Sequence, residues 1–207
     1  MEQQAFVPPT EAEIETYQAW WMGLSPAWQT AYSEMALRQT STEMPSVPVL
    51  HQIWLSPALR FAGPTAPYPN MSFELEDLSG VSALKNLEIL VVTFHKLKDL
   101  AGLEQLPQLK SLFVYNNEIK SLSGVEALKG LQELYFNVNQ VESLQPLSQL
   151  TQLHTLYCNY NRVSTLDTIG PQHKPLLKNF ICLPNDLLPD EEVIRMEREV
   201  GIRCQKG

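Results

Sequence analysis

The chain has 207 residues, of which 44% are hydrophobic and 18% charged, so it can bury a core and does not have the composition of a disordered tail. Its formal charge of −8 speaks against nucleic acid as a partner, because a protein that neutralises phosphates needs a basic face. No apolar run approaches the roughly 20 residues that span a bilayer. Residues 1–15 show no basic segment followed by an apolar one, so the sequence predicts neither a membrane anchor nor a secretory signal.

Residues 1–48 are predicted to form a helical hairpin cap followed by a linker. Thr10 and Glu13 have the spacing of a capping box, which predicts a helix from about 11 to 22. Ser25 before Pro26 is a second start signal, for a helix that would reach about Arg38. Residues 39–48 then read as a linker. Large aromatic residues of the hairpin are expected to cover the open end of the core that follows, with a partner-binding helix face as the alternative: Tyr17, Trp20, Trp21, Trp28 and Tyr32.

Residues 49–188 are dominated by an internal repeat. Blocks of the form Leu–x–x–Leu–x–apolar–x–x–Asn/His–x–apolar open every 22 residues, at Leu87, Leu109, Leu131 and Leu153, and a fifth with a two-residue insertion opens at Leu177. The clear repeats span 87–188. A degenerate first repeat spans 49–86, with a short apolar element at 49–55, a strand at 59–61 and an inserted Pro-rich loop at 63–72. Such a period predicts a stacked solenoid.

Each position of the repeat has a predicted role. Alternation along 109–114 sends Leu112 and Val114 inward and Phe113 outward, as in a short parallel strand. The asparagine three residues after the strand is expected to hydrogen-bond backbone groups in a ladder. In the first clear repeat His95 takes this place, where an imidazole N–H could donate instead, in preference to a titrating role. Leucines spaced by three predict 3₁₀ turns on the return leg. The residues expected at a tight corner there are Gly80, Gly102 and Gly124, with Pro146 in the fourth repeat.

Residues 189–207 are predicted to cap the other end. Asp190 is expected to cap a helix through about Glu199, with Gly201 as its stop. Residues 202–205 could add an edge strand and place Cys204 beside Cys182. Cys158 and Cys182 occupy the same inward position of successive repeats, so the three cysteines are interpreted as buried thiols, with a disulfide or metal role as the alternative; this favours a reducing compartment.

The blocks resemble the 22-residue class of leucine-rich repeats of bacterial internalins and phosphatase-regulator-like proteins, over roughly 75–187. This resemblance implies an α/β repeat fold: a right-handed solenoid with a short parallel concave sheet, a 3₁₀ or irregular convex side, and helical caps at both ends. It also implies protein binding through the concave sheet. The segment Trp20–Trp21–x–x–Leu24–Ser25–x–x–Trp28 resembles the helical leader of some bacterial leucine-rich repeat proteins. The departures from the pattern are His95, the insertion in the fifth repeat and the absence of an internalin secretion signal.

Aromatic residues recur at the outward positions of the predicted sheet. Strands about 4.8 Å apart would stack them into an exposed stripe, which is typical of an interface. The alternative is that neighbouring rings only stabilise the sheet. The partner-binding residues predicted on this basis are Phe94, Phe113, Tyr115, Tyr135, Tyr157 and Tyr160.

Motifs for catalysis or metal binding are absent from the sequence. There is no Gly-x-Gly-x-x-Gly, Gly-x-Ser-x-Gly or His-Glu-x-x-His pattern, and the histidines and cysteines lack metal-ligand spacing, so no catalytic residue, metal or cofactor is predicted. The sequence favours a cytoplasmic, non-enzymatic scaffold or adaptor, monomeric or weakly self-associating, that binds an unidentified protein or peptide. Two alternatives stay open: a spacer whose Trp-rich hairpin is the binding element, and an enzyme, for which Glu133 is the acid nearest the centre of the face.

Overall fold

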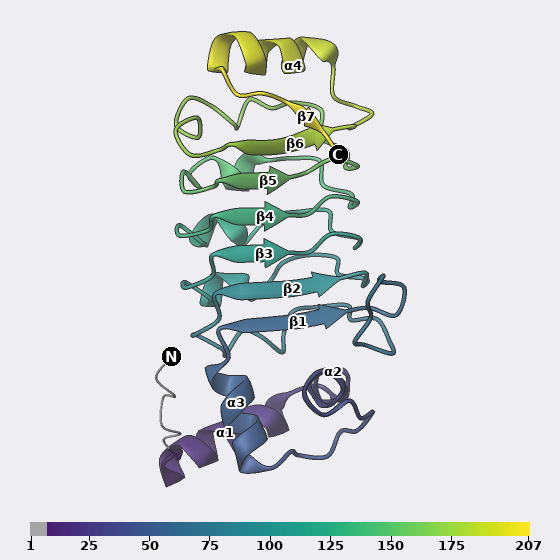
Figure 1. Ribbon diagram of the computed structural model, residues 1–207, viewed down its shortest axis with the longest axis vertical. Helices are drawn as coiled ribbons and strands as arrows, with labels where there is room; N and C mark the ends of the chain where they lie inside the picture. The colour runs from purple at the N-terminus through teal and green to yellow at the C-terminus, as the bar shows by residue number, and fades with distance from the viewer. Residues whose placement is uncertain (1–7) are drawn as a thin grey trace.

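Each repeat contributes one short strand to a parallel sheet in the computed structural model, which describes residues 8–207 (Figure 1). Over this range seven strands pair in chain order. They are β1 (Ala58–Ala62), β2 (Ile89–Thr93), β3 (Ser111–Phe113), β4 (Glu133–Tyr135), β5 (Thr155–Tyr157), β6 (Asn179–Leu183) and β7 (Gln205–Lys206). The return legs pass behind the sheet through the 3₁₀ turns η1 (Leu103–Gln105), η2 (Val125–Ala127) and η3 (Gln145–Leu147). The solenoid predicted from the 22-residue period is confirmed.

The register of the strands aligns one inward position across the sheet. Leu90, Leu112, Leu134, Leu156 and Phe180 pair along β2 to β6, and every one is fully buried. Because burying one such side chain stabilises the fold by about 2 kcal/mol, and a one-residue slip would expose the whole set, this column determines which side chains face outward.

The asparagine ladder runs along one edge of the core. The Asn117 amide oxygen accepts from the N–H of Leu97 at 3.2 Å, and its nitrogen donates to the carbonyls of Val92 and Val114, both at 3.0 Å. Asn139, Asn161 and Asn185 repeat this pattern.

His95 takes only half of the ladder role. Its Nδ1 accepts from the N–H of Leu75 at 3.1 Å, as the amide oxygen does elsewhere, whereas its Nε2 makes no hydrogen bond within residues 8–207. On its other side the ring faces the carbonyl of Phe61, the strand residue that pairs with Val92, and this contact falls short of full hydrogen-bond geometry. Burial lowers the pKa of His95 to about 4, and the nearby Phe61 carbonyl and Glu74 carboxylate oppose that shift only in part.

The repeated glycine has two different roles. Gly102 and Gly124 have φ of 97° and 102°, so the predicted corner is present in these repeats. Gly80 lacks a positive φ; instead, a Cβ at this position would lie 2.1 Å from Cδ2 of Trp28. At position 80 the absent side chain makes room for a ring from the N-terminal cap.

The N-terminal cap consists of three helices, α1 (Glu11–Gly23), α2 (Pro26–Leu37) and α3 (Val47–Leu55), where the sequence predicted a hairpin. Both predicted helix starts are confirmed. The N–H of Thr10 donates to the Glu13 carboxylate at 2.8 Å, and the Trp28 N–H donates to Ser25 Oγ at 3.3 Å. The apolar element expected at 49–55 belongs to α3, which begins within the expected linker because burial of Leu50 and Ile53 stabilises it.

The large aromatic side chains of the cap cover the open end of the solenoid core, as predicted. Trp28 packs edge-on against Phe61 of β1, with ring centroids 5.1 Å apart, and its indole N–H donates to Asp77 at 3.0 Å. The Tyr32 hydroxyl donates to the carbonyl of Gly80 at 3.0 Å. The members of this cluster that are buried are Tyr17, Trp21, Trp28 and Tyr32, and Trp20 packs against them partly exposed.

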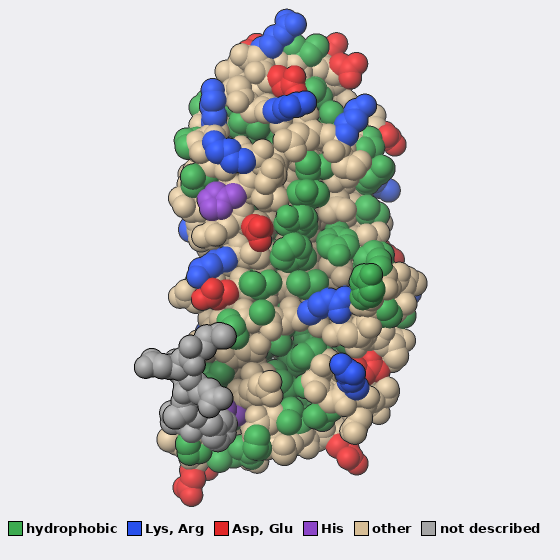
Figure 2. Space-filling view, in the orientation of Figure 1, with side chains coloured by type: hydrophobic (Ala, Val, Ile, Leu, Met, Phe, Trp, Pro, Cys, Tyr) green, Lys and Arg blue, Asp and Glu red, His purple; other side chains and the backbone are tan. Residues whose placement is uncertain are grey.

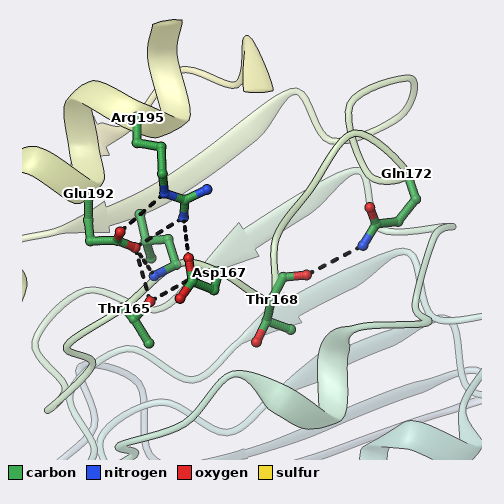
Figure 3. A network of polar contacts seen from close by, with 7 residues as sticks. Thr165, Asp167, Thr168, Gln172, Glu192 and Arg195 are labelled. Atoms are coloured by element: carbon green, nitrogen blue, oxygen red, sulfur yellow. Dashed lines mark hydrogen bonds and ion pairs between the residues drawn. The ribbon is translucent and has the colours of Figure 1, made fainter. Parts of the chain in front are cut away.

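The C-terminal end is closed by α4 (Asp190–Arg195), which continues as a π-helical turn over Met196–Val200 and ends at Gly201 in the left-handed region. Pro189, and not Asp190 as expected, is the N-cap, because the helix starts one residue early. The Glu192 carboxylate accepts from the Leu166 N–H at 2.6 Å and pairs with Arg195 at 3.1 Å (Figure 3). Arg195 also pairs with Asp167 at 3.0 Å, so these contacts hold the helix on the fourth repeat.

The last strand is displaced from its expected place at 202–205. The N–H of Ile202 bonds to the Met196 carbonyl at 3.1 Å, and the N–H of Cys204 bonds to the Glu197 carboxylate at 3.3 Å. Because the helix end uses these donors, pairing with β6 begins only at Gln205. Among the described residues, no helix is both long enough and apolar enough to cross a membrane.

Candidate protein-binding face

Three of the predicted aromatic residues form a stacked row on the outward side of the sheet. The register pairs Phe113 with Tyr135 and Tyr135 with Tyr157. The ring centroids lie 4.6 Å and 4.4 Å apart, at interplanar angles of 21° and 25°. We call these three residues the aromatic ladder, and the outward side of the sheet on which they lie the sheet face.

The stacking determines what the aromatic ladder shows to solvent. The faces of the Tyr135 ring are covered by Phe113 on one side and Tyr157 on the other, so the ring edges and phenol groups point outward. Burial, together with the nearby Glu133 carboxylate and Tyr157, raises the pKa of Tyr135, so its phenol stays protonated at neutral pH. The exposed part of the ladder therefore offers ring C–H edges, which carry partial positive charge, and hydroxyl groups.

The ends of this column are not aromatic. Val91 of β2 and Arg60 of β1 extend it in one direction, and Ile181 of β6 and Gln205 of β7 extend it in the other. Ile181 is buried, with Gly207 beside it.

The neighbouring outward column is buried at two positions, Thr93 and Asn159, and half-buried at Tyr115, Asn137 and Leu183. Tyr115 is half-buried and meets the Phe94 ring edge-on, with centroids 5.7 Å apart. Thr93 is buried where its carbonyl accepts from the N–H of Gly63, at the base of the Pro-rich loop. Asn159 is buried beside Gly207, and its Oδ1 makes no hydrogen bond within residues 8–207.

A third column consists of residues with left-handed backbone, a property that the repeat pattern alone did not predict. Phe94, Asn116, Val138 and Tyr160 all have φ between 54° and 60°. Tyr160 is 53% exposed and Val138 is 39% exposed. The left-handed region is unfavourable for side chains other than glycine and asparagine, and most of all for a β-branched residue such as valine.

All six predicted partner-binding residues thus lie on the sheet face or at the end of its strands. Phe113, Tyr135 and Tyr157 form the ladder, Tyr115 and Phe94 form an edge-on pair, and Tyr160 projects beyond them. Glu133 accepts from the Ser111 hydroxyl at 2.8 Å beside the ladder. The Pro-rich loop carries Tyr68, 82% exposed, whose carbonyl accepts a hydrogen bond from the Arg60 guanidinium.

The other titratable groups singled out in the sequence lie in the interior. The three cysteines, Cys158, Cys182 and Cys204, are free and buried, and burial raises the pKa of Cys158. Within residues 8–207 no cluster of His, Cys, Asp or Glu has the arrangement of a metal site.

Comparisons with known proteins agree with this geometry. A family model described as "Leucine Rich repeats (2 copies)" matches residues 107–149 and 129–171. The crystal structure of an internalin (inlF) from Listeria monocytogenes superimposes with a TM-score of 0.57 at 23% identity, over 65% of this chain and 40% of that one. An internalin C2 (inlC2) from the same organism gives a TM-score of 0.48 at 19% identity, over 76% of this chain and 83% of that one. No curated protein matches the sequence.

The repeats and the parallel sheet together define a leucine-rich repeat solenoid, and the family model matches it over residues 107–171. Within that class its solenoid has the fold of the internalins, and the chain spans only 40% of the length of the inlF structure.

Proposed function

We propose that this chain is a non-catalytic interaction module that binds a protein or peptide partner on the sheet face. Phe113, Tyr135 and Tyr157 would be the anchors, with Phe94, Tyr115 and Tyr160 widening the contact. The observation that carries the proposal is the row of outward aromatic side chains at one repeated position. Tyrosine suits such a role because it offers area and a hydroxyl at little cost in rotamer freedom.

Stacking within the sheet explains only part of this surface. The ladder rings stabilise one another, which accounts for their faces. It does not account for Tyr160, which is more than half exposed, or for Val138, which holds an unfavourable backbone conformation at the surface. The left-handed backbone recurs at this position in four successive repeats, so it belongs to the turn of each repeat, and the exposure of Tyr160 is what supports the binding hypothesis.

The size of the face favours a peptide segment over a broad globular contact. Seven strands about 4.8 Å apart, each exposing about 17 Å, give roughly 570 Å² in projection. A standard protein–protein interface covers about 800 Å² on each partner. A globular partner would therefore have to reach past the sheet face onto the caps.

Replacing Phe113, Tyr135 and Tyr157 together by alanine tests the proposal. The triple variant should lose capture of the partner from lysate while its unfolding stays cooperative by circular dichroism, because the core column behind the ladder is unchanged. The matched control replaces three exposed apolar residues away from the sheet face, Met22, Leu187 and Ile194, by alanine. Unchanged capture by a folded triple variant would contradict the proposal.

The burial of the cap tryptophans disfavours the alternative in which the Trp-rich hairpin binds the partner. Trp21 and Trp28 are fully buried, and Trp28 contacts the first strand of the solenoid. We propose that these residues seal the core and that the module acts in a reducing compartment, a location that its three free, buried thiols suit.

A further inference from the structure

The charge of the sheet face is opposite in sign to that of the whole chain. The strands and their ends, residues 58–63, 88–94, 110–116, 132–138, 154–160, 178–184 and 205–206, contain four bases and two acids. Their formal charge is +2 on a chain of −8, so the rest of the sequence carries −10. The bases are Arg60, Lys110, Lys178 and Lys206, and the acids are Glu88 and Glu133.

The two acids of this face are already engaged, whereas most of the bases are not. Glu88 pairs with Lys110 at 2.8 Å, and Glu133 accepts from the Ser111 hydroxyl at 2.8 Å. Within the described range, Arg60, Lys178 and Lys206 form no ion pair. These free cations are the groups that an acidic partner could reach.

The free cations lie near the two ends of the sheet, beyond the aromatic ladder. Arg60 lies on β1, in the column of the ladder, and its guanidinium is held in place by the carbonyl of Tyr68. Lys178 immediately precedes β6, and Lys206 pairs with Leu183 at the β7 end. Figure 2 shows hydrophobic side chains along the middle of the sheet and Lys and Arg side chains gathered over β6 and β7.

The ladder itself favours negatively charged or carbonyl groups. Because its rings are stacked face to face, a partner meets their C–H edges, which carry partial positive charge, and the tyrosine hydroxyls, whose hydrogen can be donated to a carboxylate or a carbonyl oxygen. A cation would need an open ring face, and both faces of Tyr135 are covered. The middle and the ends of the sheet face thus both favour negatively charged groups on a partner.

We propose that the sheet face binds an extended acidic segment of a partner protein, with apolar side chains over the aromatic ladder and carboxylates near Arg60 at one end and Lys178 and Lys206 at the other. This inference rests on the proposed function. The distance from β1 to β7 is about 29 Å, six strand spacings, which an extended chain crosses in about nine residues. The acidic remainder of the module repels such a segment, so the sheet face is where it can dock.

A random peptide library, with peptides long enough to cross the sheet and displayed on yeast, tests the inference without knowledge of the partner. The whole chain is the bait, and the Phe113→Ala/Tyr135→Ala/Tyr157→Ala variant is the counter-bait. The expected result is enrichment of acidic peptides with one or two aromatic or aliphatic residues that bind the chain and not the variant. If the enriched peptides are neutral or basic and still require the three aromatic rings for binding, the inference of an acidic segment is wrong and the proposed function is retained. Peptides that bind the variant equally well, or no enrichment at all, would overturn both.

Reversing the charge of surface lysines measures the electrostatic contribution to peptide binding without changing the buried core. Lys178→Glu with Lys206→Glu should weaken the binding of an enriched acidic peptide by about tenfold or more at low salt, because two attractive charge pairs become repulsive. Added salt should reduce the difference. Lys120→Glu with Lys129→Glu, on the return legs, makes the same change in net charge away from the sheet face. Equal weakening by both pairs would mean that only the net charge of the chain matters, and the proposed placement of the carboxylates would be wrong.

Discussion

Val138 combines a β-branched side chain with a left-handed backbone at an exposed position. The left-handed region costs an ordinary L-residue about 1–2 kcal/mol, and asparagine less, because its amide can bond the local backbone. Val138→Asn should therefore raise the free energy of unfolding by about 1 kcal/mol in urea titrations. Asn116 occupies the same position one repeat earlier, so Asn116→Val should lower it by a similar amount.

The pair of variants at this position also bears on binding. If the sheet face is the binding site, Val138→Asn should weaken partner capture while it stabilises the fold. If Val138→Asn is less stable than the parent and Asn116→Val is as stable as the parent, backbone strain is absent at this position.

His95 is expected to make the fold sensitive to mild acid. Its pKa is about 4 in the folded chain and about 6.5 in an unfolded one, so the unfolded state binds the proton more readily. Stability associated with the neutral ring is present above pH 6.5 and is lost as the pH falls toward 4, by at most about 3 kcal/mol.

Replacing His95 by asparagine should remove this sensitivity. An amide can accept from Leu75 as the ring does, donate to the preceding strand as Asn117 does, and stay neutral. The slope of stability against pH between 6.5 and 4, measured by urea unfolding, should be flatter in His95→Asn than in the parent. Parallel curves for the two proteins would assign the acid sensitivity to other groups.

At the scale of elements, the contact between cap and solenoid depends on the absence of a side chain at Gly80. A methyl group at this position would meet the Trp28 ring, which is fixed by Phe61 and Asp77. Gly80→Ala should therefore destabilise the fold by about 2 kcal/mol or more, as overpacking does in a rigid core. Gly130→Ala is the matched control, because a Cβ there meets nothing within 4 Å and the backbone lacks a positive φ.

Thermal unfolding followed by circular dichroism measures both glycine variants. The Gly130→Ala variant should melt at or slightly above the parent, since alanine restricts the unfolded chain. Equal effects of the two substitutions would show that the Trp28 ring can move aside.

Helices and strands whose ends are determined by neighbouring residues could be predicted from the sequence. Those that depend on contacts with distant residues could not. The capping box at Thr10 and the Ser25–Pro26 start act within a few residues, so α1 and α2 were found. The third cap helix depends on burial of Leu50 and Ile53 against other parts of the chain. The last strand was misplaced because Glu197 takes the N–H of Cys204 through a contact that spacing does not reveal.

The sequence predicted which residues of the candidate site share an outward position, but not their ring stacking, backbone conformation or burial. A period of 22 places Phe113, Tyr135 and Tyr157 at one outward position, and the register confirms that alignment. The stacking of their rings, the left-handed column at Val138 and the burial of Thr93 and Asn159 depend on neighbours across strands and loops. These contacts decide which part of each column a partner can touch.

At the scale of the whole molecule, the solenoid has two open ends and both are covered by helices. Solenoid repeats contact only their neighbours, so the terminal core residues would meet water if a cap were removed. At the N-terminal end these include Leu59 and Phe61 of β1, which are buried under α2 and the rest of the cap.

Deleting residues 1–40 is therefore expected to give an aggregated chain without a cooperative transition, because it exposes Phe61 and the first leucines together. Size-exclusion chromatography and a thermal melt measure this directly. Met22→Ala, on the exposed side of α1, is the control and should remain soluble with an unchanged melt. If the chain without residues 1–40 is soluble and folded but no longer binds the partner, the Trp-rich helices are the binding element. In that case the aromatic ladder would serve only to stabilise the sheet, and the triple alanine variant would keep its partner.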